Sequence, residues 1–597
     1  MPILKIEDRL KALREELLKR NLNGFVVPLT DEHASEYVAS YAQRLAWITG
    51  FTGSAGFAVV MADQAAIFVD GRYTIQVNKQ VDPKLFEICG VPGTSPLKWL
   101  GKNLTGGQKI GYDPFLHTIG WVKEARTKLA IHDAELVLTR GNPIDAVWDD
   151  QPGEPNTPVH PHDVKYAGLS HKEKRGQIAA AIRETGAEVA IITQLDSIAW
   201  LFNIRSNDVL HTPVSLAYAV LDADGKATLY IDDVKVNAAL KAHLGNEVGI
   251  APKSDFLEGV KALGKAGKKV LTDPNTASSA IFDTLIKSGA RIIKAADPCA
   301  LPKARKNKVE LNGTRATHIR DGAAVANFLH WISLEAPKGR LDEMTARDKL
   351  LAFRKVNGDL LDLSFDTISA FGPNGAICHY KLTKESNLPI KPGSLYLVDS
   401  GGQYLDGTTD ITRTVPIGEV GDEEKDRFTR VLKGHIALAT AKFPKGTTGP
   451  ELDSFARRPL WEVGLDYDHG TGHGVGCFLA VHEGPGRIAK VQNTIALEPG
   501  MIYSNEPGYY KAGEYGIRIE NLVIVREENI GGEQEMLGFE TITFCPIDKR
   551  LVKTGIMTGG EIKWLNDYHA EVWEKLNPLV SKETRDWLKE ATAPITG

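Results

Sequence analysis

The sequence predicts a three-domain protein of the α/β (α+β) class, with two related α/β domains followed by a longer α+β domain. A chain of 597 residues is too long to fold around a single core. Residues 151–162 hold four prolines in twelve positions, a composition typical of linkers. Residues 297–308 combine prolines with basic side chains ahead of a helical pattern. We therefore place the domains at 1–153, 154–302 and 303–597.

The first two domains share one order of elements. Each begins with a helix (171–185 in the second domain), continues with an apolar strand and a Trp-containing segment, and ends with a pair of strands that leads to an aspartate. The Trp-containing segments are LAWITGF (45–51) and IAWLFNI (198–204), which we interpret as turns. This order indicates a duplicated α/β module. Chance similarity between two α/β domains is the alternative, and neither copy carries a recognisable catalytic set.

The glycine-rich segment GFTGSAG (50–56) invites comparison with a phosphate-binding loop. Such a loop requires a helix directly after it, so that backbone N–H groups face the anion. Here the next residues are FAVVM, a β-branched sequence typical of a strand. We interpret the segment as a glycine turn between strands.

Composition and charge exclude several classes of protein. The residues are 42% hydrophobic and 25% charged, and the net charge is -5 without a Lys/Arg-dense stripe, so we expect no nucleic-acid partner. The five cysteines are odd in number and form no CxxC pair, which favours a reducing compartment. The first twenty residues are charged and amphipathic, and no apolar run has the length of a membrane span. We expect a cytoplasmic protein with no membrane partner.

Metal-ligating residue types gather in the third domain. Asp399 closes one apolar strand and Asp410 opens the next, with Gly401-Gly402 between them, so antiparallel pairing would bring both carboxylates to one place. His473 lies in HGTGHGVG (469–476), where the glycines predict a sharp turn and a close approach of backbone.

Two further acids end or occupy apolar strands. Glu506 ends the strand GMIYSNEP, and Glu520 lies in GIRIENLVIV (516–525). Alternation along this second strand places Arg518 and Glu520 on one face, and Ile517 and Ile519 on the other. Any one of the four acids alone would more simply be a turn residue or a solvated charge. Together with His473 they form a hard, oxygen-rich set that suits Mn²⁺ or Co²⁺, and two bridging carboxylates would hold two ions about 3.5–4 Å apart.

The blocks around these residues resemble the pita-bread metallopeptidases. In order they are VDSGG, TTDITRT, GTGHGVG, VHEGP, SNEPGYY and GIRIENLV, with FGPNGAICHY (371–380) upstream. The match is closest to the long, three-domain cytosolic aminopeptidase P type, because DGRYTIQ and AWLF in the leading domains and KWLNDYH in the tail are also similar to it. The resemblance implies two creatinase-like N-terminal domains (1–153 and 154–302) before a pita-bread catalytic domain with a C-terminal extension (303–597).

The resemblance also implies roles for individual residues. Asp410 and Glu520 would bridge two metal ions, and Glu506 would in addition transfer a proton. His379 and His482 would line the substrate site, and His469 with Arg518 would support it. Without the resemblance, His379 would be interpreted as structural, and His482 could equally be a strand-end residue whose side chain bonds to backbone. The glycines beside His469 make a helical metal pair with His473 unlikely. The implied metal ligands are Asp399, Asp410, His473, Glu506 and Glu520.

The implied reaction is hydrolysis of the bond between an N-terminal residue and a penultimate proline, by a hydroxide shared between two divalent ions. We expect Mn²⁺, with Co²⁺ and Zn²⁺ as alternatives, peptides that begin Xaa-Pro as substrates, and a homodimer. One rival is a prolidase, which cuts Xaa-Pro dipeptides; the chain length and the duplicated leading domains favour the aminopeptidase. The other is a non-catalytic pita-bread binding protein, which the full set of ligands disfavours.

Overall fold

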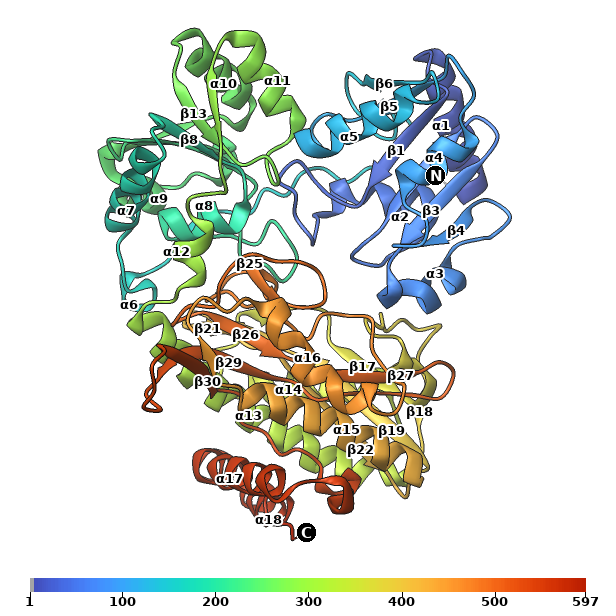
Figure 1. The fold of residues 1–597 in the computed structure, drawn as a ribbon, viewed down its shortest axis with the longest axis vertical. Coiled ribbons are helices and arrows are strands. Elements are labelled where there is room, and N and C mark those ends of the chain that lie inside the picture. Colours follow the sequence, from blue (N-terminus) through green and yellow to red (C-terminus); the bar gives the residue numbers. More distant parts are fainter. Residues whose placement is uncertain (1–4, 597) are drawn as a thin grey trace. The chain divides into compact units, whose positions relative to one another are not determined.

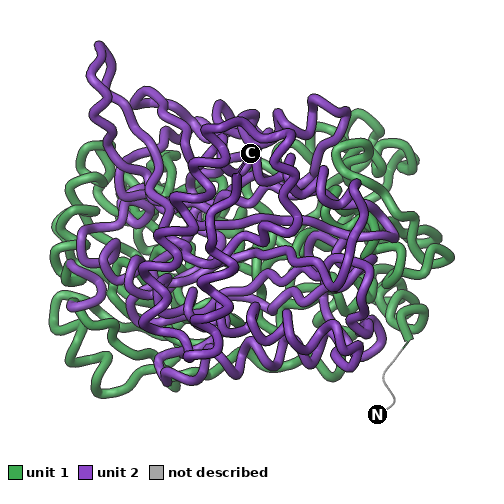
Figure 2. Tube along the Cα trace, turned by 90° about the horizontal axis from the view of Figure 1, so that it is seen from below, with its two compact units in different colours: residues 1–164, 169–300 green, residues 165–168, 301–597 purple. Residues whose placement is uncertain are grey.

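A computed structural model describes residues 5–596 (Figure 1). The chain forms two compact units, one of residues 1–164 and 169–300 and the other of residues 165–168 and 301–597 (Figure 2). The amphipathic character predicted for the N-terminus appears in helix α1 (Ile6–Lys19), which buries Leu10, Leu13 and Leu17. The first four residues of that predicted segment lie outside the described residues.

The first unit contains two six-stranded sheets with the same topology. Their strand orders are β4-β3-β2-β1-β5-β6 and β12-β11-β10-β8-β13-β14. In both, the central strand pairs antiparallel with one neighbour and parallel with the other. The predicted duplication is therefore confirmed at the level of topology. The strands are β1 (Gly24–Pro28), β2 (Phe57–Met61), β3 (Ala65–Val69), β4 (Glu87–Gly90), β5 (Lys109–Tyr112), β6 (Glu135–Leu138), β8 (Val189–Ile192), β10 (Tyr218–Asp222), β11 (Ala227–Tyr230), β12 (Val248–Ala251), β13 (Lys269–Thr272) and β14 (Arg291–Lys294).

The Trp-containing segments are short helices, so their interpretation as turns was wrong. They form α2 (Arg44–Thr49) and α8 (Leu195–Phe202), whose C-caps Gly50 and Asn203 take left-handed backbone conformations. Burial of Trp47 and Trp200 stabilises helices that are too short to form by propensity alone. The segment 50–56 consequently follows a helix and not a strand, although strand β2 comes after it as expected. The other longer helices of this unit are α3 (Thr74–Gln80), α4 (Pro96–Asn103), α5 (Ile119–Ala130), α7 (His171–Glu184), α9 (Ala238–Leu244), α10 (Phe256–Lys265) and α11 (Ser279–Ser288).

The first long helix of the second unit is α13 (Lys308–Glu335). A capping box between Asn307 and Glu310 fixes its start, and it buries Ala323, Ala326 and Leu329 at the predicted helical spacing. The other long helices are α14 (Glu343–Lys355), α15 (Asp422–Ala439), α16 (Gly449–Trp461), α17 (Gly559–Leu576) and α18 (Lys582–Ala591).

Four sheets of the second unit supply the strands that matter for the site. Their orders are β17-β19-β22, β16-β20-β21, β23-β30-β29-β26-β24-β25 and the hairpin β27-β28. The strands are β16 (Asp362–Leu363), β17 (Ile368–Phe371), β19 (Ser394–Ser400), β20 (Gly402–Tyr404), β21 (Gly407–Thr408), β22 (Ile411–Ile417), β23 (Phe443–Pro444), β24 (Gly472–Gly474), β25 (Glu483–Ile488), β26 (Ile502–Asn505), β27 (Gly508–Lys511), β28 (Tyr515–Arg518), β29 (Asn521–Glu528) and β30 (Met536–Thr541).

The main core of this unit lies against one face of the strand β28. Ile517 and Ile519 are fully buried in a cluster with Val431 and Leu432 of α15 and Leu565 of α17. Side chains on the opposite face, including Arg518, therefore point away from this core. All five cysteines are buried and free. Within the described part of the chain, none of the helices combines the length and apolar character that crossing a membrane requires.

Candidate metal centre

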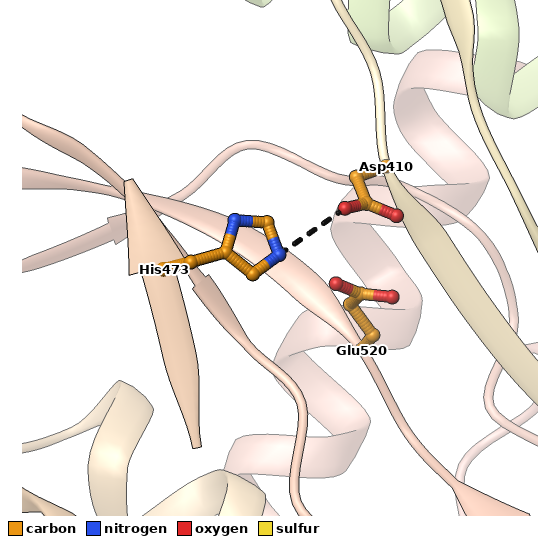
Figure 3. Close-up of side chains that lie close together, drawn as sticks. All are labelled: Asp410, His473 and Glu520. Atoms are coloured by element: carbon orange, nitrogen blue, oxygen red, sulfur yellow. Dashed lines mark ion pairs between the residues drawn. The ribbon is translucent and has the colours of Figure 1, made fainter. Parts of the chain in front are cut away.

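Three side chains from distant parts of the sequence meet in the second unit. Asp410, His473 and Glu520 each offer one ligand atom, and these atoms lie within 4.8 Å of one another (Figure 3). His473 Nε2 is 3.5 Å from Asp410 Oδ2 and 3.4 Å from Oε1 of Glu506. The structure thus brings together four of the five residues that the resemblance implied as ligands.

Asp399 joins this group through the pairing of two strands. Strands β19 and β22 are antiparallel, with Asp399 opposite Thr412, so Asp399 and Asp410 lie at the same end of the pair. The Thr412 hydroxyl donates a hydrogen bond of 2.7 Å to Glu520 Oε2. The strand pair therefore fixes both aspartates and supports a third carboxylate.

His473 lies in a three-residue strand, so the sharp turn predicted around it was wrong. A side chain at Gly472 would bring its Cβ to 2.0 Å from the Ser504 carbonyl oxygen, and one at Gly474 would come within 2.4 Å of the Glu483 carbonyl oxygen. The glycines therefore permit the close backbone approach that was predicted, but between neighbouring strands. This contact places the imidazole beside the end of β26, where Glu506 follows.

The segment from 516 to 525 was predicted to be one continuous strand, and this prediction was wrong. It forms the two strands β28 and β29. The break falls at Ile519 and Glu520, because the backbone leaves the hairpin β27-β28 and joins the sheet of β26 and β30. At the break the Glu520 N–H donates to the carbonyl oxygen of Thr412, at 3.2 Å. Tertiary hydrogen bonding thus ends the first strand here, although Ile517 and Ile519 still pack in the core while Arg518 and Glu520 reach the site.

Arg518 nevertheless lies beside the carboxylates. It is 2% exposed, which contradicts the alternative of an exposed arginine at a sheet edge. Its Nη2 donates to Asp399 Oδ2 at 2.5 Å, its Nη1 to the Tyr510 hydroxyl at 2.6 Å, and its Nε to the Thr412 hydroxyl at 3.1 Å. The planar guanidinium is therefore fixed at three points and orients one carboxylate.

The group carries an excess of buried negative charge. Burial raises the pKa of Asp410 and of Glu520 well above their usual ranges, and the neighbouring carboxylates raise both pKa values further. One oxygen of Asp399, Oδ1, is buried without a hydrogen-bond partner among the described residues. Four carboxylates face a single guanidinium, so bound cations would satisfy both the charge and the unpaired oxygen. The oxygen-rich donors with one imidazole fit divalent ions of the Mn²⁺ type.

The remaining predicted histidines lie around this group. The rings of His482 and His473 are 4.3 Å apart in an edge-to-face arrangement. His469 has its Nε2 2.8 Å from the Tyr510 hydroxyl, so it reaches Arg518 through that tyrosine. His379 is half-buried and directly follows Cys378, whose thiol pKa is raised to about 11 by burial, against the lowering effect of Arg518. The loop of His379 therefore approaches the same cluster.

Several polar residues of the site were not predicted from sequence. Tyr510 links His469 to Arg518, and its presence in the SNEPGYY block was the only available signal. Below His469, Arg457 donates to the His469 carbonyl oxygen at 2.7 Å, and the Thr471 hydroxyl donates to Asp453 at 2.6 Å. Arg457 and Asp453 come from α16, where no pattern distinguishes them from residues of any amphipathic helix.

Comparison with known proteins places this site in a family. Residues 312–527 match metallopeptidase family M24, and residues 535–595 match the C-terminal region of peptidase M24. Residues 9–142 and 150–310 each match the creatinase/prolidase N-terminal domain. The four matches follow one another along nearly the whole chain.

Relatives of similar length are found in plants and fungi. "Aminopeptidase P2" of Arabidopsis thaliana is 41% identical, over 99% of this chain and 89% of the relative. "Probable Xaa-Pro aminopeptidase P" of Laccaria bicolor is 44% identical, over 98% of this chain and 93% of the relative.

Solved structures give the same grouping. The X-prolyl aminopeptidase of Caenorhabditis elegans, described as a cytosolic enzyme with a di-nuclear active site, is 33% identical with a TM-score of 0.95, over 99% of this chain and all of that one. The Xaa-Pro dipeptidase of Bacillus anthracis, 25% identical with a TM-score of 0.51, covers only 64% of this chain. The chain, with two creatinase N-terminal domains ahead of a pita-bread domain, belongs to the aminopeptidase P group of metallopeptidase family M24.

Proposed function

We propose that Asp399, Asp410, His473, Glu506 and Glu520 bind two divalent ions, with Mn²⁺ as the native metal and Co²⁺ or Zn²⁺ as alternatives. The observation that carries this proposal is the cluster of four carboxylates and one imidazole. In this cluster Asp399, Asp410 and Glu520 are buried, and one Asp399 oxygen lacks a hydrogen-bond partner among the described residues. The di-nuclear active site described for the C. elegans relative supports the number of ions. Asp410 and Glu520, the most deeply placed acids, would bridge them.

The chain removes the N-terminal residue from peptides whose second residue is proline. The names of relatives that span 98% or more of the chain support this substrate class. The bond before proline is a tertiary amide without an N–H group, and the ring fixes φ. A site for it must recognise the ring by shape and must deliver a proton to the leaving nitrogen.

The residues of this chain divide that work. When bound, the divalent ions would lower the pKa of the attacking water and polarise the scissile carbonyl group. Glu506, whose Oε1 accepts a hydrogen bond from the Ser504 hydroxyl at 3.2 Å, takes a proton from the attacking water and passes it to the proline nitrogen. His482 donates a hydrogen bond to the oxygen on which negative charge develops. Arg518 holds Asp399 in one orientation.

The supporting residues complete the substrate site. We propose that His379 and His482 line it, and that His469 supports it through Tyr510 and Arg518. We also propose a cytoplasmic homodimer. The location is supported by the five free cysteines and by the cytosolic C. elegans relative, and the dimer by the family resemblance. Light scattering of the purified protein would test the dimer.

A matched peptide series tests the activity. With Mn²⁺ added back to metal-free protein, Ala-Pro-Ala should yield alanine and Pro-Ala, whereas Ala-Pro and Ala-Ala-Ala should be poor substrates. Faster cleavage of Ala-Pro than of Ala-Pro-Ala would identify a prolidase instead. Stoichiometric metal binding without cleavage of any peptide in the series would favour a binding protein.

A further inference from the structure

The loop of residues 400–409 connects the two strands that carry the aspartates of the candidate metal centre. Asp399 precedes this loop, which includes the short strands β20 and β21, and Asp410 follows it. Its conformation therefore contributes, together with the pairing of β19 and β22, to the distance between the two carboxylates. A side chain at Gly401 would place its Cβ 1.9 Å from the Thr409 carbonyl oxygen, so the two ends of the loop touch. The close contact therefore lies between residues that are each next to or near one of the two aspartates.

A buried aspartate on α13 holds the second end of this loop. Asp321 is 3% exposed and accepts a hydrogen bond of 2.9 Å from the hydroxyl of Thr409, the residue directly before Asp410. Its other oxygen accepts a bond of 2.8 Å from the Tyr404 hydroxyl in the middle of the loop. The Thr409 hydroxyl also accepts a bond from the Gly402 N–H at 2.9 Å. One carboxylate thus fixes the loop at two places.

An arginine on α14 holds the first end. Arg354 is 2% exposed and donates from Nε and Nη2 to the two oxygens of Asp321, at 2.7 and 3.1 Å. The same guanidinium donates to the side chain and to the carbonyl oxygen of Ser400, the residue directly after Asp399. Arg354 and Asp321 therefore join two helices to both ends of one loop.

Stability alone does not account for this pair. A buried ion pair recovers little more than its own desolvation cost, and apolar residues of similar size often stabilise a core as well or better. Among the described residues, the side chains of Asp321 and Arg354 form hydrogen bonds with each other and with the loop. Those to the loop ends fall on residues 400 and 409, each adjacent in the chain to a proposed metal ligand. Residues that do not touch a metal ion but hold its ligands in position are usually placed in this way.

We propose that Asp321 and Arg354 are positioning residues of the metal centre, which hold Asp399 and Asp410 at the separation that two divalent ions require. This proposal rests on the proposed metal centre. Neither residue touches the reacting atoms. Their loss should act first on metal affinity, because each would leave the loop free to move the two aspartates apart.

The test compares two isosteric threonine variants by calorimetric titration of metal-free protein with MnCl₂. Thr409→Val removes only the hydroxyl that links Asp321 to Gly402. Thr429→Val on α15 is the matched control, because the Thr429 hydroxyl is also buried and accepts a hydrogen bond from the Lys553 N–H at 2.9 Å. It donates to the carbonyl oxygens of Lys425, at 2.7 Å, and Leu551, at 3.3 Å. Thermal unfolding of each variant shows how much stability each substitution costs.

Thr409→Val should bind Mn²⁺ about 10- to 100-fold more weakly than wild type, whereas Thr429→Val should bind it normally at a similar loss of melting temperature. Asp321→Asn should weaken binding in the same range, and if that variant does not fold, Thr409→Val still decides. Normal Mn²⁺ affinity in Thr409→Val, or equal weakening in Thr429→Val, would overturn the proposal. A wild-type protein that binds no Mn²⁺ would instead refute the metal centre itself.

Discussion

Replacing Arg518 by lysine separates the positive charge from the geometry that the guanidinium provides. Arginine makes three contacts here, to Asp399, Tyr510 and Thr412, on three different nitrogens. An ammonium group keeps the charge but is a point donor on a flexible stem, so it can serve only one of these partners in a comparable position. The substitution should therefore keep the fold and lose the orientation of Asp399.

The size of the effect follows from the hydrogen bonds that a lysine cannot make. Two hydrogen bonds to a charged donor, at roughly 1.5–3 kcal/mol each, set an upper limit of about 3–6 kcal/mol. Partial rearrangement of the lysine lowers this, and changes in groups that orient metal ligands usually cost about 10- to 100-fold, or about 1.4–2.7 kcal/mol. We expect a loss within that range in Mn²⁺ affinity or in kcat/KM.

The assay is Mn²⁺ titration together with steady-state cleavage of an Xaa-Pro-Yaa peptide. Arg526→Lys is the matched control, because Arg526 lies on the following strand with a side chain that is 53% exposed and pairs only with Glu528 among the ion pairs of the described residues. The control should behave as wild type. If Arg518→Lys also shows wild-type affinity and turnover, the guanidinium does not orient Asp399 and the argument fails.

Three other perturbations probe separate parts of the site and the fold. Asp410→Ala removes a proposed bridging carboxylate and should leave fewer than two ions per chain by elemental analysis; a full metal load with normal turnover would contradict the assignment. His482→Ala should lower kcat by about 10²- to 10³-fold with metal content unchanged, whereas an effect on KM alone would assign it to binding. Burial lowers the pKa of His117 to about 4 and, with help from Arg413, those of His435 and His569 to about 3. These histidines stay neutral when folded, so stability is present above pH 6.5 and is lost as pH falls towards 3, by about 2 kcal/mol per histidine between pH 7 and pH 5. His569→Gln should therefore show a smaller drop in melting temperature over that interval than wild type, and an equal drop would count against a neutral buried imidazole.

Local sequence predicted the strands beside Asp399, Asp410 and Glu506, because each joins an apolar run to a polar side chain. It did not predict β24, which has no apolar run and was interpreted as a turn. The pairs Asp399 with Thr412 and Asn505 with Asn521 have the antiparallel registers that such runs favour. Their convergence was predicted only through the family resemblance, because no short-range pattern shows that β22, β24 and β29 meet in space. The break at Glu520 could not be predicted, since its cause is a hydrogen bond to Thr412 more than a hundred residues earlier.

Polar residues on helices were the least predictable part of the site. Asp321, Arg354 and Asp453 are charged residues within helical patterns, where a charge more often faces solvent. Their burial depends on tertiary partners such as Thr409 and Ser400. The short helices α2 and α8 escaped prediction for a related reason, because the packing of their tryptophans, and not local propensity, stabilises them.

Titration of metal-free protein with Mn²⁺, while the release of free alanine from Ala-Pro-Ala is followed by mass spectrometry, tests the central claim most directly. The cluster of four carboxylates, one imidazole and one guanidinium requires that turnover rise with added metal and saturate at two ions per chain. Full turnover without metal, or saturation at a single ion, would contradict a two-ion centre built from Asp399, Asp410, His473, Glu506 and Glu520.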